Sequence, residues 1–279
     1  MNDYFDFILQ KLIAAGIENP RLETRILLAA VLQCAPSEIF GNVKLSVAQQ
    51  RAAEDMLQQR LAHKPLDKII GRREFYKANF VVNENVLSPR PDTEILVEEA
   101  IKLLPDTAVE ILDLGTGSGC IIESILAEKP QARGVAVDIS AAALQTARLN
   151  AENLQLTTRL DFVNADWFAP DFCAKIGKKF DMIVSNPPYI PTADIATLAA
   201  EVKNYDPAAA LDGGADGYDS YRRIAELAPE LLQNGCYILL EAGIGQAEKI
   251  ADIFSNHKLK LINIVPDLNG ISRCIILQK

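Results

Sequence analysis

One tetrapeptide combines groups that could hold a planar –NH2 group. Asn186-Pro187-Pro188-Tyr189 directly follows the run 181–185, which is apolar at its centre and β-branched at Ile183 and Val184. Proline has no N–H donor and a fixed φ, so two prolines in succession end strand pairing and leave a stiff loop. Amide and carbonyl oxygens of that loop can accept hydrogen bonds from an –NH2 group, and the phenol ring can pack on the flat group that carries it. The pattern predicts a site that positions an amide or an exocyclic amine as a nucleophile.

A glycine-rich loop and an acidic residue indicate a nucleoside site. The loop 115–119 reads Gly-Thr-Gly-Ser-Gly after an apolar run, and Asp138 ends the next apolar run, about 20 residues later. A dinucleotide fingerprint would need glycine where Cys120 stands. The observed spacing lets the backbone approach a ligand closely, and a carboxylate at such a strand end can accept hydrogen bonds from both hydroxyls of a ribose. We therefore expect a nucleoside ligand and disfavour a Rossmann oxidoreductase.

Alternating strands and helices would place these residues together. Apolar runs separated mostly by amphipathic helices predict a mostly parallel, doubly wound α/β sheet. Ligands of such sheets bind at the carboxyl ends of the strands, which is where the glycine loop, Asp138, Trp167 and the tetrapeptide fall. The seven expected strands are 109–114, 133–137, 160–163, 181–185, 236–241, 258–265 and 271–277.

The first quarter of the chain has helical periodicity. We expect helices over 4–15, 20–33 and 47–63, the last opened by a capping box in which Ser46 and Gln49 cap each other. This domain, 1–75, could equally be a packing lid or a docking module. Phe75, Phe80 and the turn residues after them predict a β-hairpin linker over 76–90, followed by a second domain over 91–279. We expect Thr93 or Asp92 to cap the next helix.

Composition excludes several classes of protein. Hydrophobic residues make up 49% of the chain, and no apolar run approaches the ~20 residues of a membrane span. The start, Met1-Asn2-Asp3-Tyr4, lacks the basic flank of a signal peptide, so we expect a cytoplasmic protein. Five scattered cysteines without CxxC spacing predict reduced, buried thiols and no metal site. The net charge of −9 disfavours a large nucleic-acid footprint.

In combination, these motifs resemble the PrmC/HemK family of protein-(glutamine-N5) methyltransferases, which use S-adenosylmethionine to modify peptide chain release factors. Asn-Pro-Pro-Tyr alone does not decide, because adenine-N6 methyltransferases share it. The stretches 88–94 and 211–217 point to the glutamine enzymes; Arg90, held between two prolines in the first of them, is equally compatible with an ion pair. One minor departure is Asp206, where the family often has Glu. The matching motifs are Ser-Pro-Arg-Pro-Asp-Thr-Glu at 88–94, Asp-Leu-Gly-Thr-Gly-Ser-Gly at 113–119, Asp138, Asp166-Trp167, Asn-Pro-Pro-Tyr at 186–189, Asp206-Pro207 and Leu-Asp-Gly-Gly-Ala-Asp-Gly at 211–217.

The resemblance implies a Rossmann-like class I S-adenosylmethionine methyltransferase domain, with a seven-stranded, mostly parallel sheet, after the helical domain and the hairpin linker. It implies that the glutamine of a Gly-Gly-Gln motif is the target and that the helical domain helps to recognise the release factor. Asn186, Pro187 and Tyr189 would be catalytic, and Pro188 would join them in binding the glutamine amide. The implied cofactor-binding residues are Gly115, Thr116, Gly117, Ser118, Gly119, Asp138, Trp167 and Asn186.

Two other functions stay open at this point. The first is an adenine-N6 methyltransferase of DNA or RNA, which the negative net charge disfavours because it would need a basic channel. The second is a non-catalytic nucleoside-binding protein, against which the intact acceptors of the tetrapeptide argue. We expect release factors as partners, a monomer, and no direct contact with nucleic acid or membrane.

Overall fold

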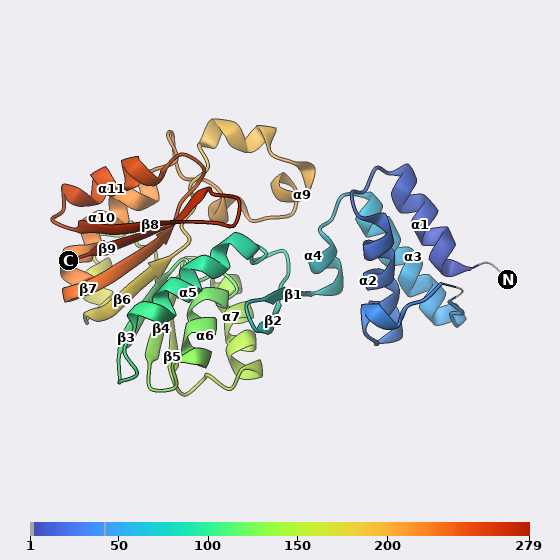
Figure 1. Ribbon diagram of the computed structural model, residues 1–279, viewed down its shortest axis with the longest axis horizontal. Coiled ribbons are helices and arrows are strands. Elements are labelled where there is room, and N and C mark those ends of the chain that lie inside the picture. The colour runs from blue at the N-terminus through green and yellow to red at the C-terminus, as the bar shows by residue number, and fades with distance from the viewer. Residues whose placement is uncertain (1–2, 42) are drawn as a thin grey trace. The chain divides into compact units, whose positions relative to one another are not determined.

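A computed structural model describes residues 3–41 and 43–279 (Figure 1). The chain forms two compact units. One contains the chain up to Gly71 together with Ala199–Tyr205, and the other contains Arg72–Leu198 and Asp206–Lys279. Met1 and Asn2, which bear on the expectation about a signal peptide, lie outside the described residues. No helix in the described ranges is long and apolar enough to cross a membrane.

The first unit is helical, as expected. The capping box of the third helix is present: Ser46 Oγ accepts from the Gln49 N–H at 3.4 Å, and Gln49 Oε1 accepts from the Ser46 N–H at 2.9 Å. That helix ends at Leu61, two residues before the expected end, and a five-residue helix follows that is too short to show periodicity. The helices are α1 (Tyr4–Ala14), α2 (Pro20–Leu32), the 3₁₀ turn η1 (Pro36–Glu38), α3 (Val47–Leu61) and α4 (Leu66–Ile70).

A segment from much later in the chain completes this unit. It contains the short helix α9 (Ala200–Lys203). Arg60, buried on α3, is paired with Glu201 at 2.7 Å and with Glu23 of α2 at 2.6 Å. The Tyr205 hydroxyl donates to the Ala62 carbonyl at 2.7 Å. The long loop after the Asn-Pro-Pro-Tyr tetrapeptide therefore contributes a turn of helix to the helical unit.

The second unit is built on a seven-stranded sheet with the order β5-β4-β3-β6-β7-β9-β8 (Figure 1). The first five strands in that order are parallel, and β9 is antiparallel to both of its neighbours. All seven expected strands are present, with bounds that differ by one to four residues. The strands are β3 (Glu110–Leu114), β4 (Arg133–Asp138), β5 (Leu160–Asn164), β6 (Phe180–Ser185), β7 (Leu232–Glu241), β8 (Lys260–Pro266) and β9 (Ser272–Gln278).

Helices cover both faces of the sheet (Figure 1). Alternate residues of β3 point to opposite faces: Ile111 packs in the cluster with α5, α6 and α7, whereas Leu112 packs in the cluster with α8, α10 and α11. A sheet covered on both sides requires central strands that are mostly apolar, and β3 and β6 are buried along most of their length. The helices are α5 (Glu94–Leu103), α6 (Cys120–Glu128), α7 (Ala141–Asn153), α8 (Phe172–Ile176), α10 (Asp219–Leu231) and α11 (Ala247–Ser255).

The hairpin lies earlier than expected and belongs to the second unit. Its strands are β1 (Arg72–Phe75) and β2 (Ala78–Val81), not 76–90, because Tyr76 takes the turn with a φ of 54°. Asn150 of α7 holds β2 through both backbone groups of Val81, at 2.7 and 3.1 Å. The boundary between the units therefore falls after Gly71 instead of near 75, and the residues after the hairpin are free to line a site.

The start of α5 also differs from expectation. Pro91–Thr93 forms the 3₁₀ turn η2, and neither candidate side chain caps the helix. Thr93 Oγ1 donates to Glu241 instead, at 2.5 Å, and Asp92 pairs with Arg273 at 3.0 Å. The partners of both side chains lie on neighbouring strands, Glu241 on β7 and Arg273 on β9. A sequence pattern typical of an N-cap therefore makes tertiary contacts here.

The five cysteines are free thiols, but only two of them are fully buried. Burial raises the pKa of Cys120 and Cys274, so both stay protonated at neutral pH. Cys34, Cys173 and Cys236 are half-buried, which corrects the expectation of uniformly buried thiols.

Candidate active site

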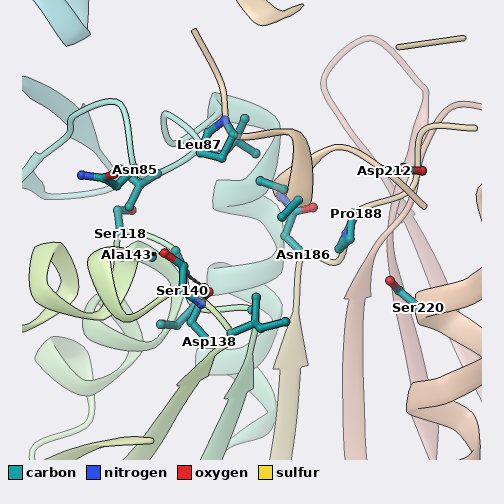
Figure 2. A pocket seen from close by; sticks show the side chains of 18 of the residues that line it. Asn85, Leu87, Ser118, Asp138, Ser140, Ala143, Asn186, Pro188, Asp212 and Ser220 are labelled. Carbon is teal, nitrogen blue, oxygen red and sulfur yellow. Dashed lines mark hydrogen bonds between the residues drawn. The ribbon is translucent and has the colours of Figure 1, made fainter. Parts of the chain in front are cut away.

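A cavity of about 480 Å³ opens at the carboxyl ends of β3, β4 and β6 (Figure 2). Figure 2 shows Asp138 and Ser140 after one strand and Asn186 and Pro188 after another, around the same space. This volume is within the range of small-molecule sites. Gly119, Pro187 and Tyr189 are not part of the described lining. The expected residues that do line it are Gly115, Thr116, Gly117, Ser118, Asp138, Trp167, Asn186 and Pro188.

The glycine loop needs glycine for its backbone shape. Gly115, Gly117 and Gly119 all have a positive φ, of 75°, 56° and 84°, a region that costs other residues strain. Two hydrogen bonds to neighbouring elements hold the loop: Thr116 Oγ1 donates to Asp113 Oδ2 of β3 at 2.6 Å, and Asn150 Nδ2 of α7 donates to the Ser118 carbonyl at 2.9 Å. The loop therefore presents backbone close to any ligand in the cavity.

Asp138 is fixed by two backbone donors. The Gly117 N–H donates to Oδ2 at 2.9 Å and the Ser140 N–H to Oδ1 at 2.8 Å. Burial raises the pKa of Asp138, and these two bonds oppose the shift. Each carboxylate oxygen keeps a further lone pair, so the side chain can accept two more hydrogen bonds from a ligand diol.

Unsatisfied donors in the wall of the cavity fit a polar nucleoside ligand. Ser88 Oγ, Ser118 Oγ and Trp167 Nε1 are buried, line the cavity, and have no hydrogen-bond partner among the described residues. Buried polar atoms are normally paired, so these three are suited to ligand contacts. The Trp167 ring lies over Gly115, where an added Cβ would be 3.0 Å from it. Within residues 3–41 and 43–279, no group of three or more His, Cys, Asp or Glu side chains could hold a metal ion.

A second acidic side chain lies beneath the loop. Glu123 of α6 is fully buried against Gly119, and none of the described residues donates to either of its carboxylate oxygens. Burial, and secondarily the charge of Asp113, raise the pKa of Glu123 well above its usual value. Folding therefore favours the protonated form of Glu123 over the ionised form.

This burial makes the free energy of unfolding depend on pH. The stabilisation linked to protonated Glu123 is complete below the pKa of the unfolded chain and is lost as pH rises through the higher folded pKa. Glu123→Leu removes the charge at similar size, so we expect it to raise the free energy of unfolding by about 1–3 kcal/mol at pH 8 and by less at pH 5. Urea denaturation at both pH values measures this, with exposed Glu152→Leu on α7 as control. A gain that is equal at the two pH values would show that Glu123 does not titrate there.

The tetrapeptide continues directly from buried β6. Ser185 Oγ donates to the Leu114 carbonyl at 2.6 Å, which joins the end of β6 to the end of β3 just before the glycine loop. Asn186 and Pro188 reach the cavity, while Pro187 is buried. The ligand loop and the amide side chain thus share one rigid edge of the sheet.

The Leu-Asp-Gly-Gly stretch braces the residues that follow Pro188. The backbone of Ile190 pairs with Leu211 at 2.9 Å and with Gly213 at 2.8 Å. An added Cβ at Gly213 would lie 2.8 Å from the Tyr189 Cα, and one at Gly217 would lie 2.5 Å from the Tyr189 carbonyl oxygen. Only glycine allows this close approach, so the two motifs form one structural unit.

Tyr189 lies beside the cavity instead of lining it. Its carbonyl accepts from Gln246 Nε2 at 3.1 Å. Burial, with the nearby charge of Glu241, raises the pKa of Tyr189 to about 12, so the phenol is neutral at physiological pH. Arg90 lines the cavity and is paired with buried Asp206 at 3.0 Å, which establishes the ion pair that the sequence left open.

Several lining residues were not expected from the sequence. Ile139 and Phe168 are more than half exposed beside the cavity, and each directly follows an expected ligand residue, so adjacency was the available signal. The stretch 85–87 after β2 also lines it, although the sequence indicated only the hairpin linker and its turn residues there. Thr93 lines the cavity with Glu241 behind it, and no sequence signal pointed to that pair.

Known proteins match both units. The model of the PrmC N-terminal domain matches residues 5–71, and that of the methyltransferase small domain matches residues 89–204. The catalytic domain of hMettl16, solved with a MAT2A 3'UTR hairpin, superposes with a TM-score of 0.57 at 14% identity, over 72% of this chain and 74% of that one. With the strand order and the cavity, this shows the class I methyltransferase fold that the sequence predicted.

Curated relatives show the particular family. Release factor glutamine methyltransferase of Rhodospirillum rubrum is 40% identical over 271 residues, covering 96% of this chain and 82% of that protein. The enzyme of the same name from Geobacter sulfurreducens is 41% identical over 263 residues, covering 93% and 90%. The chain belongs to the release factor glutamine methyltransferase family, which confirms the resemblance drawn from the motifs.

Proposed function

We propose that this protein transfers a methyl group from S-adenosylmethionine to the side-chain amide nitrogen of the glutamine in the Gly-Gly-Gln motif of peptide chain release factors. The observation that carries the proposal is that Asn186 lines the same cavity as Asp138 and the glycine loop. A nucleoside-binding carboxylate and an amide-binding side chain on one sheet edge suit methyl transfer to an –NH2 group. Membership of the family supplies the substrate class.

The residues of the cavity fit the cofactor. Asp138 would accept from the ribose hydroxyls, the glycine loop would back the methionine portion, and Trp167 would lie against the adenine. The unpaired Ser88, Ser118 and Trp167 donors support this assignment. When bound, S-adenosylmethionine supplies an electrophilic methyl group on a sulfonium and a neutral thioether as leaving group, so the transfer requires no metal.

An amide nitrogen is a poor nucleophile because its lone pair is delocalised into the carbonyl. Asn186 Oδ1 and the Pro187 carbonyl would accept the two amide hydrogens, drawing charge onto nitrogen and dispersing the positive charge that develops there. Neutral Tyr189 would pack on the amide plane. Holding the amide nitrogen about 3–3.5 Å from the methyl carbon, in line with the bond from that carbon to sulfur, would remove much of the entropic barrier to transfer.

We further propose that the helical unit helps to recognise the release factor. The match of residues 5–71 to the PrmC N-terminal domain supports this. The segment Ala199–Tyr205 lies in the long loop that follows the tetrapeptide, and it contacts Arg60 and Ala62 of the helical unit. Through this segment, recognition of the release factor would be linked to the amide site. Translation termination takes place in the cytoplasm, where we place the protein as a monomer, without direct contact to nucleic acid.

Incubation of the full-length protein with a purified release factor and methyl-labelled S-adenosylmethionine tests the proposal. We expect label on the glutamine of the Gly-Gly-Gln motif, located by proteolysis and mass spectrometry. A release factor whose motif glutamine is replaced by glutamate should take up none, because the –NH2 group is gone. Label on adenine in DNA or RNA, with none on the release factor, would establish the adenine-N6 alternative instead.

A further inference from the structure

A buried carboxylate lies behind Asn186. Glu241 is the last residue of β7, which pairs with β6, and its side chain is almost fully buried. Thr93 Oγ1 donates to Glu241 Oε2 at 2.5 Å, and Asn186 Nδ2 donates to Thr93 Oγ1 at 3.4 Å. The three side chains, from three different elements, form one directed chain of donors that ends on the carboxylate.

The direction of this chain decides which end of the Asn186 amide faces the cavity. A hydroxyl has one hydrogen to donate. Because Thr93 gives that hydrogen to Glu241, its oxygen can only accept from Asn186, and the atom of Asn186 that meets it must be Nδ2. Oδ1 is thereby left for a ligand, which is the orientation that a substrate –NH2 group requires.

Loss of the charge on Glu241 would remove this control. A protonated Glu241 could donate to Thr93, whose hydrogen would then be free to turn toward Asn186 and favour the opposite orientation of the amide. Burial raises the pKa of Glu241 to about 7, opposed by Thr93, Arg273 and Asn186. The other titratable groups that act on this carboxyl, or on which it acts, are Asp92, Cys120, Tyr189, Tyr221 and Cys274.

We propose that Glu241 and Thr93 are positioning residues for the reaction: ionised Glu241 orients the Thr93 hydroxyl, and the hydroxyl orients Asn186 with its oxygen toward the substrate. This inference rests on the proposed glutamine methylation. It assigns a function to a carboxylate that touches neither ligand. It also assigns Thr93, inside the Ser-Pro-Arg-Pro-Asp-Thr-Glu stretch, a reason to be a hydroxyl residue.

Full-length variants test the hydroxyl. Thr93→Val keeps the size but removes both hydrogen bonds, so we expect kcat for release factor methylation to fall about 10- to 100-fold, as when a reacting group is misplaced by about 1 Å. Thr93→Ser should recover most of that loss. Calorimetry should show cofactor affinity within about 2-fold of the unmodified protein, since Thr93 orients only the amide. Thr157→Val, in an exposed turn, is the matched control.

The pH profile tests the carboxylate. In the unmodified protein, kcat should fall as pH drops below about 7, because Glu241 becomes protonated. Glu241→Gln should have a lower kcat and no such fall, whereas Thr157→Val should retain it. Burial also raises the pKa of Asp113 to about 7, so a fall that survives Glu241→Gln would assign the titration to a group other than Glu241, such as Asp113, and overturn the proposal.

The outcomes separate the two levels of inference. If the unmodified protein does not methylate the release factor, the proposed function fails and this inference fails with it. If it does, but Thr93→Val and Glu241→Gln both retain kcat and the pH profile, only the positioning role fails. Thermal unfolding shows whether each variant folds. If Thr93→Val does not fold, the pH profile of Glu241→Gln decides; if Glu241→Gln does not fold, kcat of Thr93→Val and its recovery in Thr93→Ser decide.

Discussion

Asn186→Ala is expected to lower kcat for glutamine methylation by about 10²–10³-fold, by analogy with the removal of one preorganised donor from an oxyanion hole. The substitution leaves the two prolines and β6 in place, and it deletes the side-chain acceptor together with the Nδ2 donor to Thr93 Oγ1. That acceptor gains importance as the nitrogen becomes positive, so the loss should fall on kcat more than on KM. Steady-state kinetics with a release factor and labelled cofactor measure both constants.

Two variants give this experiment its controls. Asn186→Asp keeps an acceptor but places a charge beside Thr93 and Glu241, so we expect activity between that of the unmodified protein and that of Asn186→Ala. Asn153→Ala, at the exposed end of α7, should change nothing. Methylation by Asn186→Ala at the unmodified rate would mean that the tetrapeptide is a structural turn.

The sheet and the ligand edge of this protein could be predicted because they depend on local pattern. A strand buried on both faces must be apolar throughout, and the chain after it must turn. β4 ends at Asp138 and β6 ends just before Asn186, so the two residues that carry the proposed chemistry were predicted at the ends of their strands. The carboxyl ends of parallel strands lie at the same edge of the sheet. The sequence therefore predicted that Asp138 and Asn186 would lie near one cavity.

The support of Asn186 could not be predicted, because it depends on contacts between distant parts of the chain. Thr93 and Glu241 are 148 residues apart. A threonine that follows Pro-Asp and precedes an amphipathic helix has every local feature of an N-cap, and only the position of β7 gives it another partner. The Ala199–Tyr205 segment is a similar case, since Glu201 meets Arg60 across 141 residues.

The burial of Glu123 could not be predicted from the sequence either, for a different reason. It falls among Ile121, Ile122, Ile125 and Leu126 on a helix that is buried nearly all round. The apolar periodicity predicted the buried face, and a charged side chain between those positions would ordinarily point to solvent. Its burial follows from the close packing of α6 under the glycine loop, which is a property of the assembled sheet.

Asp138→Ala is expected to weaken S-adenosylmethionine binding by about 1.5–3 kcal/mol, which corresponds to roughly a 10- to 150-fold higher Kd. In the proposed complex the carboxylate is the charged acceptor for two ribose hydroxyls. It also accepts from the Gly117 and Ser140 N–H groups, so its removal frees two backbone donors beside the ligand. Titration calorimetry of the full-length protein without release factor measures the affinity independently of methyl transfer.

Asp138→Asn separates the two contributions of this side chain. An amide retains one acceptor oxygen but has no charge, so it can satisfy one of the two backbone donors and would make weaker bonds to the diol. We therefore expect a loss of affinity smaller than that of Asp138→Ala, while exposed Asp161→Ala on β5 should bind as the unmodified protein does. Because Asn186 follows a different strand, β6, Asp138→Ala should raise the Kd and leave kcat at saturating cofactor largely unchanged. Unchanged affinity in Asp138→Ala would remove Asp138 from the ribose site and leave it only the role of holding the glycine loop.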